Sequence, residues 1–510
     1  MRTSLAIILT ISTPAMADEI GYEELVARLG GTAPNGAGVP IVQVEANEST
    51  AGLSYRPNGS EPDFAGKVFN LFSGASANST HATFVGKNLY GQYGIAKGIT
   101  QINCFDANGW LSTYLRLGQG QAALPLPPTN GSKLFNCSWI GSAGVASDNE
   151  ILRRADYAMH RDGTLVIAGL NNGAGGSVPA LMGCGYNGIT VGLTNGNHTF
   201  GSPPTGTDGV GRQKPELVAP GQYTSFSTPV VSACAAVLYQ LASELPYSLN
   251  INRRSGVAVK ASLLAGATRS ATWSNGAPQS GASRGVATTP IDPIVGFGTV
   301  NIDRAHRILS ADEAIGQSTA SAAIAGASVT LAGWEYEVIS STTFERHWRI
   351  DVPGTADVRV ALTWTRNPAS SQFTGSAPIV QNNDLKLQRI DNGQAVSMVG
   401  DAGVGSFVSG NVVSQSTVDN VEHLAIEDLA PGSYLLSVNR VTTTGYASIA
   451  TLAWIVDVTA VLGDLNGDGL VNGADLGLLL SNWGGTGIGD LNVDGDVNGA
   501  DLGLLLSAWS

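Results

Sequence analysis

The segment Lys214-Pro-Glu-Leu-Val-Ala-Pro-Gly221 is followed directly by Gln222-Tyr-Thr-Ser-Phe-Ser-Thr-Pro229 and then by an almost wholly apolar run. The run predicts a buried helix from Thr228, with Pro229 in the first turn, where its missing N–H has no helical partner to lose. Ser225 would then lie at a helix N-terminus, where the helix dipole and unpaired backbone N–H groups stabilise negative charge. The pattern fits a nucleophilic serine, and equally a serine that only caps the helix.

Two earlier segments supply the partners that a nucleophilic serine needs, a base to take its proton and an acid to orient that base. Gly38-Val-Pro-Ile-Val-Gln-Val-Glu45 is an apolar strand pattern that ends in a carboxylate. Ser79-Thr-His-Ala-Thr-Phe-Val-Gly86 places His81 at the start of a helix pattern. Alone, such a glutamate is typical of a surface turn and a single histidine is more often structural. Only the three segments together indicate a nucleophilic hydrolase site.

In this order the three segments resemble the Asp, His and Ser motifs of the subtilase family of serine proteases. Leu165-Val-Ile-Ala-Gly-Leu-Asn-Asn-Gly173 is similar to the family's A-A-G-N-x-G, and Gly296-Phe-Gly-Thr-Val-Asn301 to its closing G-x-G-x-V-N. The resemblance spans Gly38 to Ala305 and implies a subtilisin-like serine endopeptidase that hydrolyses peptide bonds. It assigns the nucleophile, base, orienting acid and oxyanion donor to Ser225, His81, Glu45 and Asn171.

The chain departs from the family pattern at several positions. The family's acid is usually Asp, but glutamate can also accept a hydrogen bond from imidazole; if Glu45 does not orient His81, Glu48 is the alternative. Ala82 and Phe84 replace the glycine and second histidine of the family's H-G-T-H. Asn172 is the alternative oxyanion donor. We also expect the family's folding pro-domain to be absent, because only a short segment precedes the first strand.

The resemblance also implies where a peptide substrate binds. In the family the peptide adds as a strand between two segments, which here are Ser138-Trp-Ile140 and Ala168-Gly-Leu170. Trp139 and Leu170 would then line the cleft. The bulk of both side chains makes a place in the core about as probable.

The pattern along the chain predicts several domains. Residues 18–310 alternate strand and helix patterns, which predicts an α/β fold with a parallel sheet and helices on both faces. Residues 316–457 show period-two runs without a convincing helix period, which predicts an antiparallel β-sandwich. This second domain resembles the jelly-roll domain of some secreted subtilases. Three of its acidic residues are more typical of plain loop carboxylates than of calcium ligands: Asp384, Asp419 and Glu422.

Residues 462–510 contain a repeat, in which Asp464 to Trp483 returns 26 residues later as Asp490 to Trp509. Each copy has the spacing D-x-N-x-D-G-x-x-N-x-x-D, which wraps a hard cation with oxygen atoms as in an EF-hand loop. The repeat resembles a dockerin, a small α-helical calcium-loop module whose usual partner is a cohesin. The expected calcium ligands are Asp464, Asn466, Asp468, Asn472 and Asp475 in the first copy and Asp490, Asn492, Asp494, Asn498 and Asp501 in the second. Because its helices lack the basic residues of many dockerins, a cell-surface partner is the alternative.

The remaining features concern location and ligands. Arg2, the apolar run Leu5 to Ile11 and Ala15-Met-Ala17 predict a signal peptide over residues 1–17 and a secreted or cell-surface protein without a transmembrane anchor. Four cysteines allow three disulfide pairings, although buried free thiols fit the apolar surroundings of Cys137 and Cys234 better. A formal net charge of −13 argues against a nucleic-acid partner. We expect structural calcium and no organic cofactor.

The leading hypothesis is an active secreted protease. The main alternative is a catalytically inactive subtilase-fold binding or surface-assembly protein, supported by Glu45 and by the altered histidine motif. A third hypothesis is a calcium-dependent assembly protein, supported by the tail.

Overall fold

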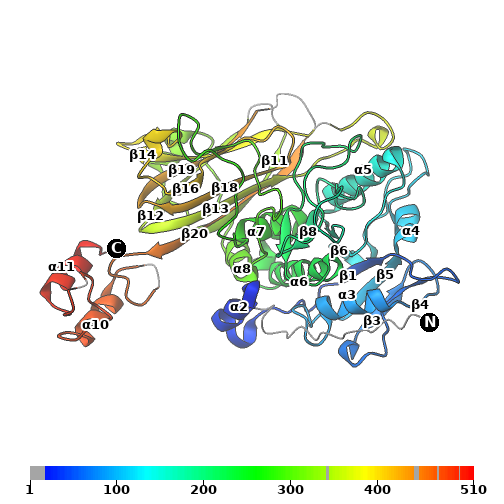
Figure 1. Ribbon diagram of the computed structural model, residues 1–510, viewed down its shortest axis with the longest axis horizontal. Coiled ribbons are helices and arrows are strands. Elements are labelled where there is room, and N and C mark those ends of the chain that lie inside the picture. The colour runs from blue at the N-terminus through cyan, green and yellow to red at the C-terminus, as the bar shows by residue number, and fades with distance from the viewer. Residues whose placement is uncertain are drawn as a thin grey trace.

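The computed structural model describes residues 18–340, 344–378, 380–441, 447–467, 470–492 and 494–509. Figure 1 shows an α/β domain, a β-rich domain packed against it, and a small helical domain at the C-terminus that projects from the end of strand β20. The predicted signal peptide, residues 1–17, lies outside the described residues and stays a prediction.

The α/β domain contains a seven-stranded parallel sheet in the order β3-β5-β1-β6-β7-β8-β9. After β1 the chain adds β3 and β5 on one side of it, and then crosses to add β6 and the later strands on the other side. The strand order therefore reverses between β1 and β6. In open parallel sheets, ligands bind beyond the carboxyl ends of the strands at such a reversal. The strands are β1 (Ile41–Glu45), β3 (Val68–Leu71), β5 (Gln101–Asp106), β6 (Leu134–Cys137), β7 (Leu165–Gly169), β8 (Ile189–Leu193) and β9 (Leu217–Ala219), with a separate pair β2 (Ser54–Arg56) and β4 (Ala77–Asn78).

Helices cover both faces of this sheet, which confirms the predicted architecture. Strand β1 shows how the faces are divided, because Ile41 joins one apolar core while Val42 and Val44 join the other. The first core includes residues of α2 (Tyr22–Leu29), α3 (Thr80–Tyr90), α6 (Thr224–Ser243), α7 (Gly256–Gly266) and α8 (Ile302–Ser310), and the second includes residues of α4 (Ala107–Gly109) and α5 (Val145–Asp162).

Helix α6 begins at Thr224, four residues before the predicted start, so the prediction that Pro229 lies in the first turn is wrong. The N–H of Thr224 donates to Oδ1 of Asn172 at 2.8 Å. A side chain from another segment therefore satisfies a donor that the local sequence leaves unpaired. By length and composition α6 could cross a membrane, but 83% of its most apolar window is buried inside the protein, as expected of a core helix.

The second domain consists of two stacked sheets that enclose a separate apolar core, which confirms a β-sandwich. One sheet has the order β11-β20-β13-β18-β16 and is antiparallel. The other has the order β10-β17-β14-β19-β12, with β15 beside β14, and is antiparallel apart from the pair β10–β17. The strands are β11 (Ala332–Ile339), β12 (Glu345–Val352), β13 (Thr355–Trp364), β14 (Asn383–Asp391), β15 (Gln394–Val396), β16 (Ser409–Asn411), β17 (Val413–Ser414), β18 (Val421–Leu429), β19 (Gly432–Arg440) and β20 (Ser448–Ala460).

Three details of the second domain differ from the sequence-based expectation. A short helix, α9 (Ala320–Ala325), precedes the first strand. Strand β10 (Val286–Ala287), from the segment assigned to the first domain, pairs with β17 of the sandwich. Asp419 and Glu422 are buried rather than exposed loop carboxylates, and burial raises the pKa of each.

The C-terminal domain consists of two loop–helix units that pack on each other. Helices α10 (Gly473–Ser481) and α11 (Gly499–Ser507) each follow one copy of the repeat. Four apolar side chains form their shared core: Val471, Leu479, Val497 and Leu505. The four cysteines of the chain are all free thiols in the first domain, which decides between the alternatives left open by the sequence.

Candidate active site

Glu45 and His81 form a hydrogen-bonded pair at the carboxyl end of β1. Glu45 is the last residue of the strand and its side chain is fully buried. Its Oε2 lies 2.8 Å from Nδ1 of His81, the second residue of α3. Nε2 is thereby left as the ring nitrogen that can accept a proton. Glutamate therefore reaches the imidazole at normal hydrogen-bond length despite its extra methylene.

Gln43 holds the other oxygen of this carboxylate. Its Nε2 donates to Oε1 of Glu45 at 2.8 Å and to the carbonyl of Ala82 at 3.0 Å. The hydroxyl of Tyr90 donates to Oε1 of Gln43. Gln43 and Glu45 share one face of β1 because side chains alternate along a strand, so this alternation was the available signal for a residue that the sequence analysis did not single out.

Glu48 caps helix α3 and does not contact the imidazole. Its two carboxylate oxygens accept the backbone N–H groups of Thr80 and His81 at 2.8 and 3.1 Å. Oγ of Ser79 accepts the N–H of Ala82 at 2.8 Å. These three bonds satisfy the unpaired donors of the first helical turn and fix the position of His81. The ring is oriented by its hydrogen bond to Glu45, whereas Glu48 holds the start of the helix.

The pKa of His81 reflects opposing effects. Partial burial lowers the pKa, whereas the hydrogen bond with Glu45 and the negative charges of Glu45 and Glu48 raise it. The sum is a pKa above the ordinary histidine value, because the nearby carboxylates favour the imidazolium. A stabilised imidazolium is the form that a general base takes after it has accepted a proton.

Ser225 is the second residue of α6, and the N-cap position is occupied by Tyr223. Ser225 is therefore not the capping residue. Its hydroxyl donates to the carbonyl of Ser138 at 3.3 Å, and among the described residues no hydrogen bond joins it to His81. For the imidazole to take the proton of Ser225, the hydroxyl would first have to turn away from Ser138. Catalytic hydrogen bonds commonly tighten in this way only when substrate is bound.

Asn171 and Asn172 both line the space beside Ser225, but they are held differently. Oδ1 of Asn172 accepts the N–H of Thr224 at 2.8 Å, while the hydroxyl of Thr224 donates to the carbonyl of Leu170 at 2.6 Å. Because a backbone N–H can only donate, this contact fixes the orientation of the amide and leaves its NH₂ group as a donor. Asn171 is anchored through its backbone, with its carbonyl accepting the N–H of Thr199 at 3.0 Å.

A pocket of about 70 Å³ lies next to Ser225. Its walls come from the ends of β6 and β7 and from the start of α6. They are Ser138, Trp139, Ile140, Gly169, Leu170, Asn171, Asn172, Thr224 and Ser225. Trp139 and Leu170 therefore line a cleft, as expected from the resemblance, although both are also almost completely buried. Gly169 is required at this point, because a Cβ there would meet Oγ1 of Thr228 at 2.7 Å.

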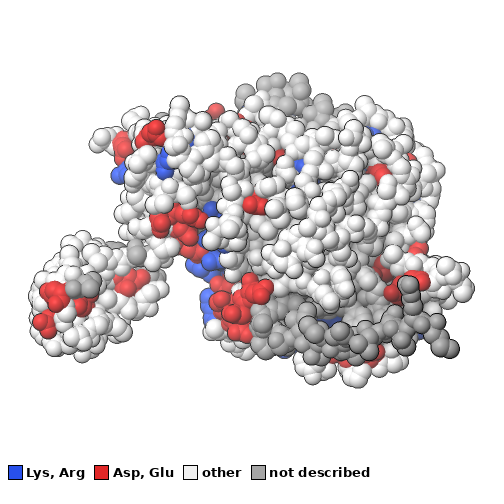
Figure 2. Space-filling view, viewed as in Figure 1, with Lys and Arg blue, Asp and Glu red and all other residues white. Residues whose placement is uncertain are grey.

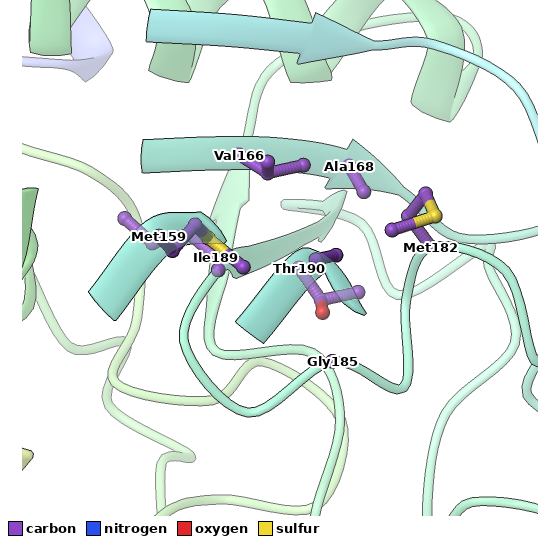
Figure 3. A pocket seen from close by; sticks show the side chains of 9 residues that line it. Met159, Val166, Ala168, Met182, Gly185, Ile189 and Thr190 are labelled. Carbon is purple, nitrogen blue, oxygen red and sulfur yellow. The ribbon is translucent and has the colours of Figure 1, made fainter. Parts of the chain in front are cut away.

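A second cavity lies behind the strands and is not a binding site. It is lined mostly by apolar side chains of α5, β7 and β8, together with Met182 and Thr190, as Figure 3 shows. Its volume is about 10 Å³, which is at the lower limit for one water molecule. We interpret it as a packing gap.

Comparisons with known proteins give structural likenesses only. No family model matches the chain, and no curated protein matches it significantly. Among solved structures it is similar to the prenylagaramide maturation protease PagA, with 19% identity and a TM-score of 0.38 over 57% of this chain and 99% of that one. For a cold-adapted subtilisin-like serine proteinase the identity is 19% and the TM-score 0.30, over 44% and 83% of the two chains. Fervidolysin from Fervidobacterium pennivorans, a keratinolytic enzyme related to subtilisin, is 15% identical with a TM-score of 0.38. That match covers 68% of this chain and 50% of fervidolysin.

The two C-terminal loops share a set of three hydrogen bonds. Asp475 accepts the N–H groups of Leu465, Asn466 and Asn472, and Asp501 accepts the equivalent three in the second copy. Figure 2 shows acidic side chains gathered on this small domain. In the parts of the chain that the structure describes, no three acidic, histidine or cysteine side chains converge as a metal site, and Asp468 lies outside those parts. The side chains expected to bind are all oxygen donors, which fits a hard cation, and calcium stays a prediction.

Proposed function

We propose that the chain is a serine endopeptidase in which Ser225 is the nucleophile, His81 the general base and Glu45 the orienting acid. The observation that carries this proposal is the buried Glu45 carboxylate 2.8 Å from Nδ1 of His81, whose ring centroid lies 6.4 Å from that of Phe226, the residue after Ser225. A structural histidine has no need of a buried anion. A base that must become an imidazolium does, because the anion compensates the positive charge.

The mechanism follows from these positions. Oγ of Ser225 attacks the peptide carbonyl while Nε2 of His81 takes the hydroxyl proton, and the carbonyl oxygen becomes an oxyanion. The N–H of Ser225 and the NH₂ of Asn172 are the proposed donors to this oxyanion, with Asn171 as the alternative. The C–N bond then breaks, and His81 gives its proton to the leaving amine. Water releases the acyl group from Ser225 by the same steps in reverse order.

The fluorophosphonate test separates an active protease from an inactive binding or assembly protein. We expect the purified protein to be labelled covalently, and Ser225→Ala to lose the label while its circular dichroism spectrum stays the same. The matched control is Ser227→Ala, two residues further along α6, which should still be labelled. A well-folded wild type that does not react would favour the binding protein and would point to Glu45 as the place where catalysis was lost.

The proposal extends to export and to the tail. Export rests on the sequence of residues 1–17 alone. For the tail we propose a dockerin-like attachment module that binds calcium and then a cohesin-like or cell-surface partner. Two half-exposed residues recur at the same positions of its two helical units, Leu480 with Trp483 and Leu506 with Trp509, and this pairing supports a binding surface.

A further inference from the structure

Phe226 lies against the ring of His81 and joins it to two further aromatic side chains, Phe84 and Tyr223. The Phe226 ring centroid lies 6.4 Å from that of His81, 6.0 Å from that of Phe84 and 5.8 Å from that of Tyr223. Phe84 lies three residues after His81 on α3, and Phe226 lies three residues after Tyr223, so each pair shares one face of its helical turn. The first turns of two helices thus place one aromatic cluster next to the imidazole.

This cluster is open to solvent. Phe84 is 48% exposed and Tyr223 is 45% exposed, with Phe226 partly buried between them. Exposed apolar groups that touch one another are unfavourable unless a ligand covers them. Nζ of Lys87 lies 6.0 Å from the centroid of the Phe84 ring and is paired with Glu61 at 2.8 Å. The cluster is therefore an electrically neutral aromatic surface.

The chemistry of the site decides which part of a substrate meets this surface. His81 must give its proton to the leaving amine, so the residue that carries this amine passes next to the imidazole. The pocket beside Ser225 that Trp139 and Leu170 line is then left for the acyl part. The aromatic cluster is not among the residues that line this pocket. It therefore faces the first residue of the leaving group.

We propose that Phe84, Tyr223 and Phe226 form a specificity-determining subsite for an aromatic or large apolar residue directly after the scissile bond. This inference rests on the proposed protease function and names the substrate class of the same site. Contact with aromatic rings favours such a side chain through apolar burial and edge or offset ring packing. A glycine at that position gains neither.

Aminolysis of the acyl-enzyme tests the subsite in isolation. The probe is N-acetyl-trialanine ethyl ester, whose small leaving group does not need the aromatic surface. Ser225 is acylated and ethanol leaves; phenylalanine amide or glycine amide is then added to compete with water. The amine forms the new C–N bond, the ester bond to Oγ breaks, and the amine proton passes through His81 to Oγ. Because this step reverses peptide-bond acylation, the amine occupies the leaving-group subsite.

We expect phenylalanine amide to be incorporated at least about tenfold more efficiently than glycine amide, as expected for burying one aromatic side chain. Phe84→Ala should reduce this ratio several-fold, and Phe84→Leu should recover part of it; because both amines compete for the same acyl-enzyme, the ratio does not depend on the rate of ester hydrolysis. Tyr93→Ala is the matched control, since Tyr93 is 72% exposed on the same domain and has no aromatic contact with the site.

The outcomes separate this inference from the proposal on which it rests. Equal incorporation of the two amines by an active wild type would overturn the subsite and leave the protease intact. An unchanged ratio in Phe84→Ala together with Tyr223→Ala would also overturn it. Failure of a folded wild type to hydrolyse the ester would overturn the protease function, and the subsite with it.

Discussion

At the scale of single residues, Glu45 controls both the orientation and the pKa of His81. Its buried carboxylate contacts Nδ1 and is itself held by Gln43, so the imidazole has one position and one tautomer. Since His81 must be neutral to accept a proton, activity rises as the pH rises through its pKa. That pKa is raised by Glu45, so the acid limb of the rate profile is expected above pH 6.5, the ordinary value for histidine.

We predict that Glu45→Gln lowers kcat by about 10²–10⁴-fold and moves the acid limb of kcat/KM to lower pH. The rate falls because the imidazolium loses its compensating anion. The limb moves because the variant lacks the negative charge that raises the pKa of His81, whereas burial still lowers this pKa. The measurement is the pH dependence of kcat/KM for a chromogenic peptide, wild type beside variant.

Glu48→Gln is the matched control for this prediction, because Glu48 bonds the backbone of α3 rather than the imidazole. It should cost about 0.5–2 kcal/mol of stability through the weakened helix cap and leave kcat on the alkaline plateau nearly unchanged. If the two variants lost activity equally, the distinction between orienting acid and helix cap would be wrong.

At the scale of elements, the start of α6 brings the proposed nucleophile and the proposed oxyanion donor together. Oδ1 of Asn172 accepts the N–H of Thr224, so the strand-end loop after β7 and the first turn of α6 are joined beside Ser225. We predict that Asn172→Asp, which keeps this acceptor but removes the NH₂ donor, lowers kcat by about 10²–10³-fold. Asn171→Asp adds the same charge one residue away and should lower kcat much less. If Asn171→Asp lowered kcat more than Asn172→Asp does, Asn171 would be the oxyanion donor instead.

The same junction shows which features could be predicted from the sequence and which could not. The parallel sheet and the order of the site residues were predictable, because apolar runs and motif order are local properties. The start of α6 was not, because a contact with Asn172, 52 residues earlier in the chain, satisfies the helix donor. The contact of Gln43 with Glu45 could have been predicted, because alternate side chains of a strand share one face. The pairing of β10 with the sandwich could not, because a strand of two residues is too short to show a hydrophobic pattern.

At the scale of the whole molecule, Arg366 joins the sandwich to the α/β domain. It is almost fully buried and bonds Asp156 and Asp208, each at 2.8 Å, while its backbone pairs with the side chain of Asn187. Removing one partner of a buried ion pair costs about 3–5 kcal/mol. Asn187 lies in the segment between the pocket loop and β8. The sandwich therefore supports a segment of the α/β domain that leads from the pocket.

The tail shows the opposite relation, because the fully buried core formed by its described residues consists of four apolar side chains. Domains of this size usually need a disulfide, a metal or a partner, and the tail contains no cysteine. We therefore predict that calcium slows amide hydrogen exchange in residues 464–475 and 490–501 of the full chain, measured by mass spectrometry in the Ser225→Ala background to prevent self-cleavage. Asp464→Ala should weaken protection in both loops, because Val471 and Val497 share one core. Peptides from the α/β domain serve as the internal control and should not change. Exchange in the two loops that is the same in calcium and in EDTA would contradict calcium binding and leave a partner protein as the source of the tail's stability.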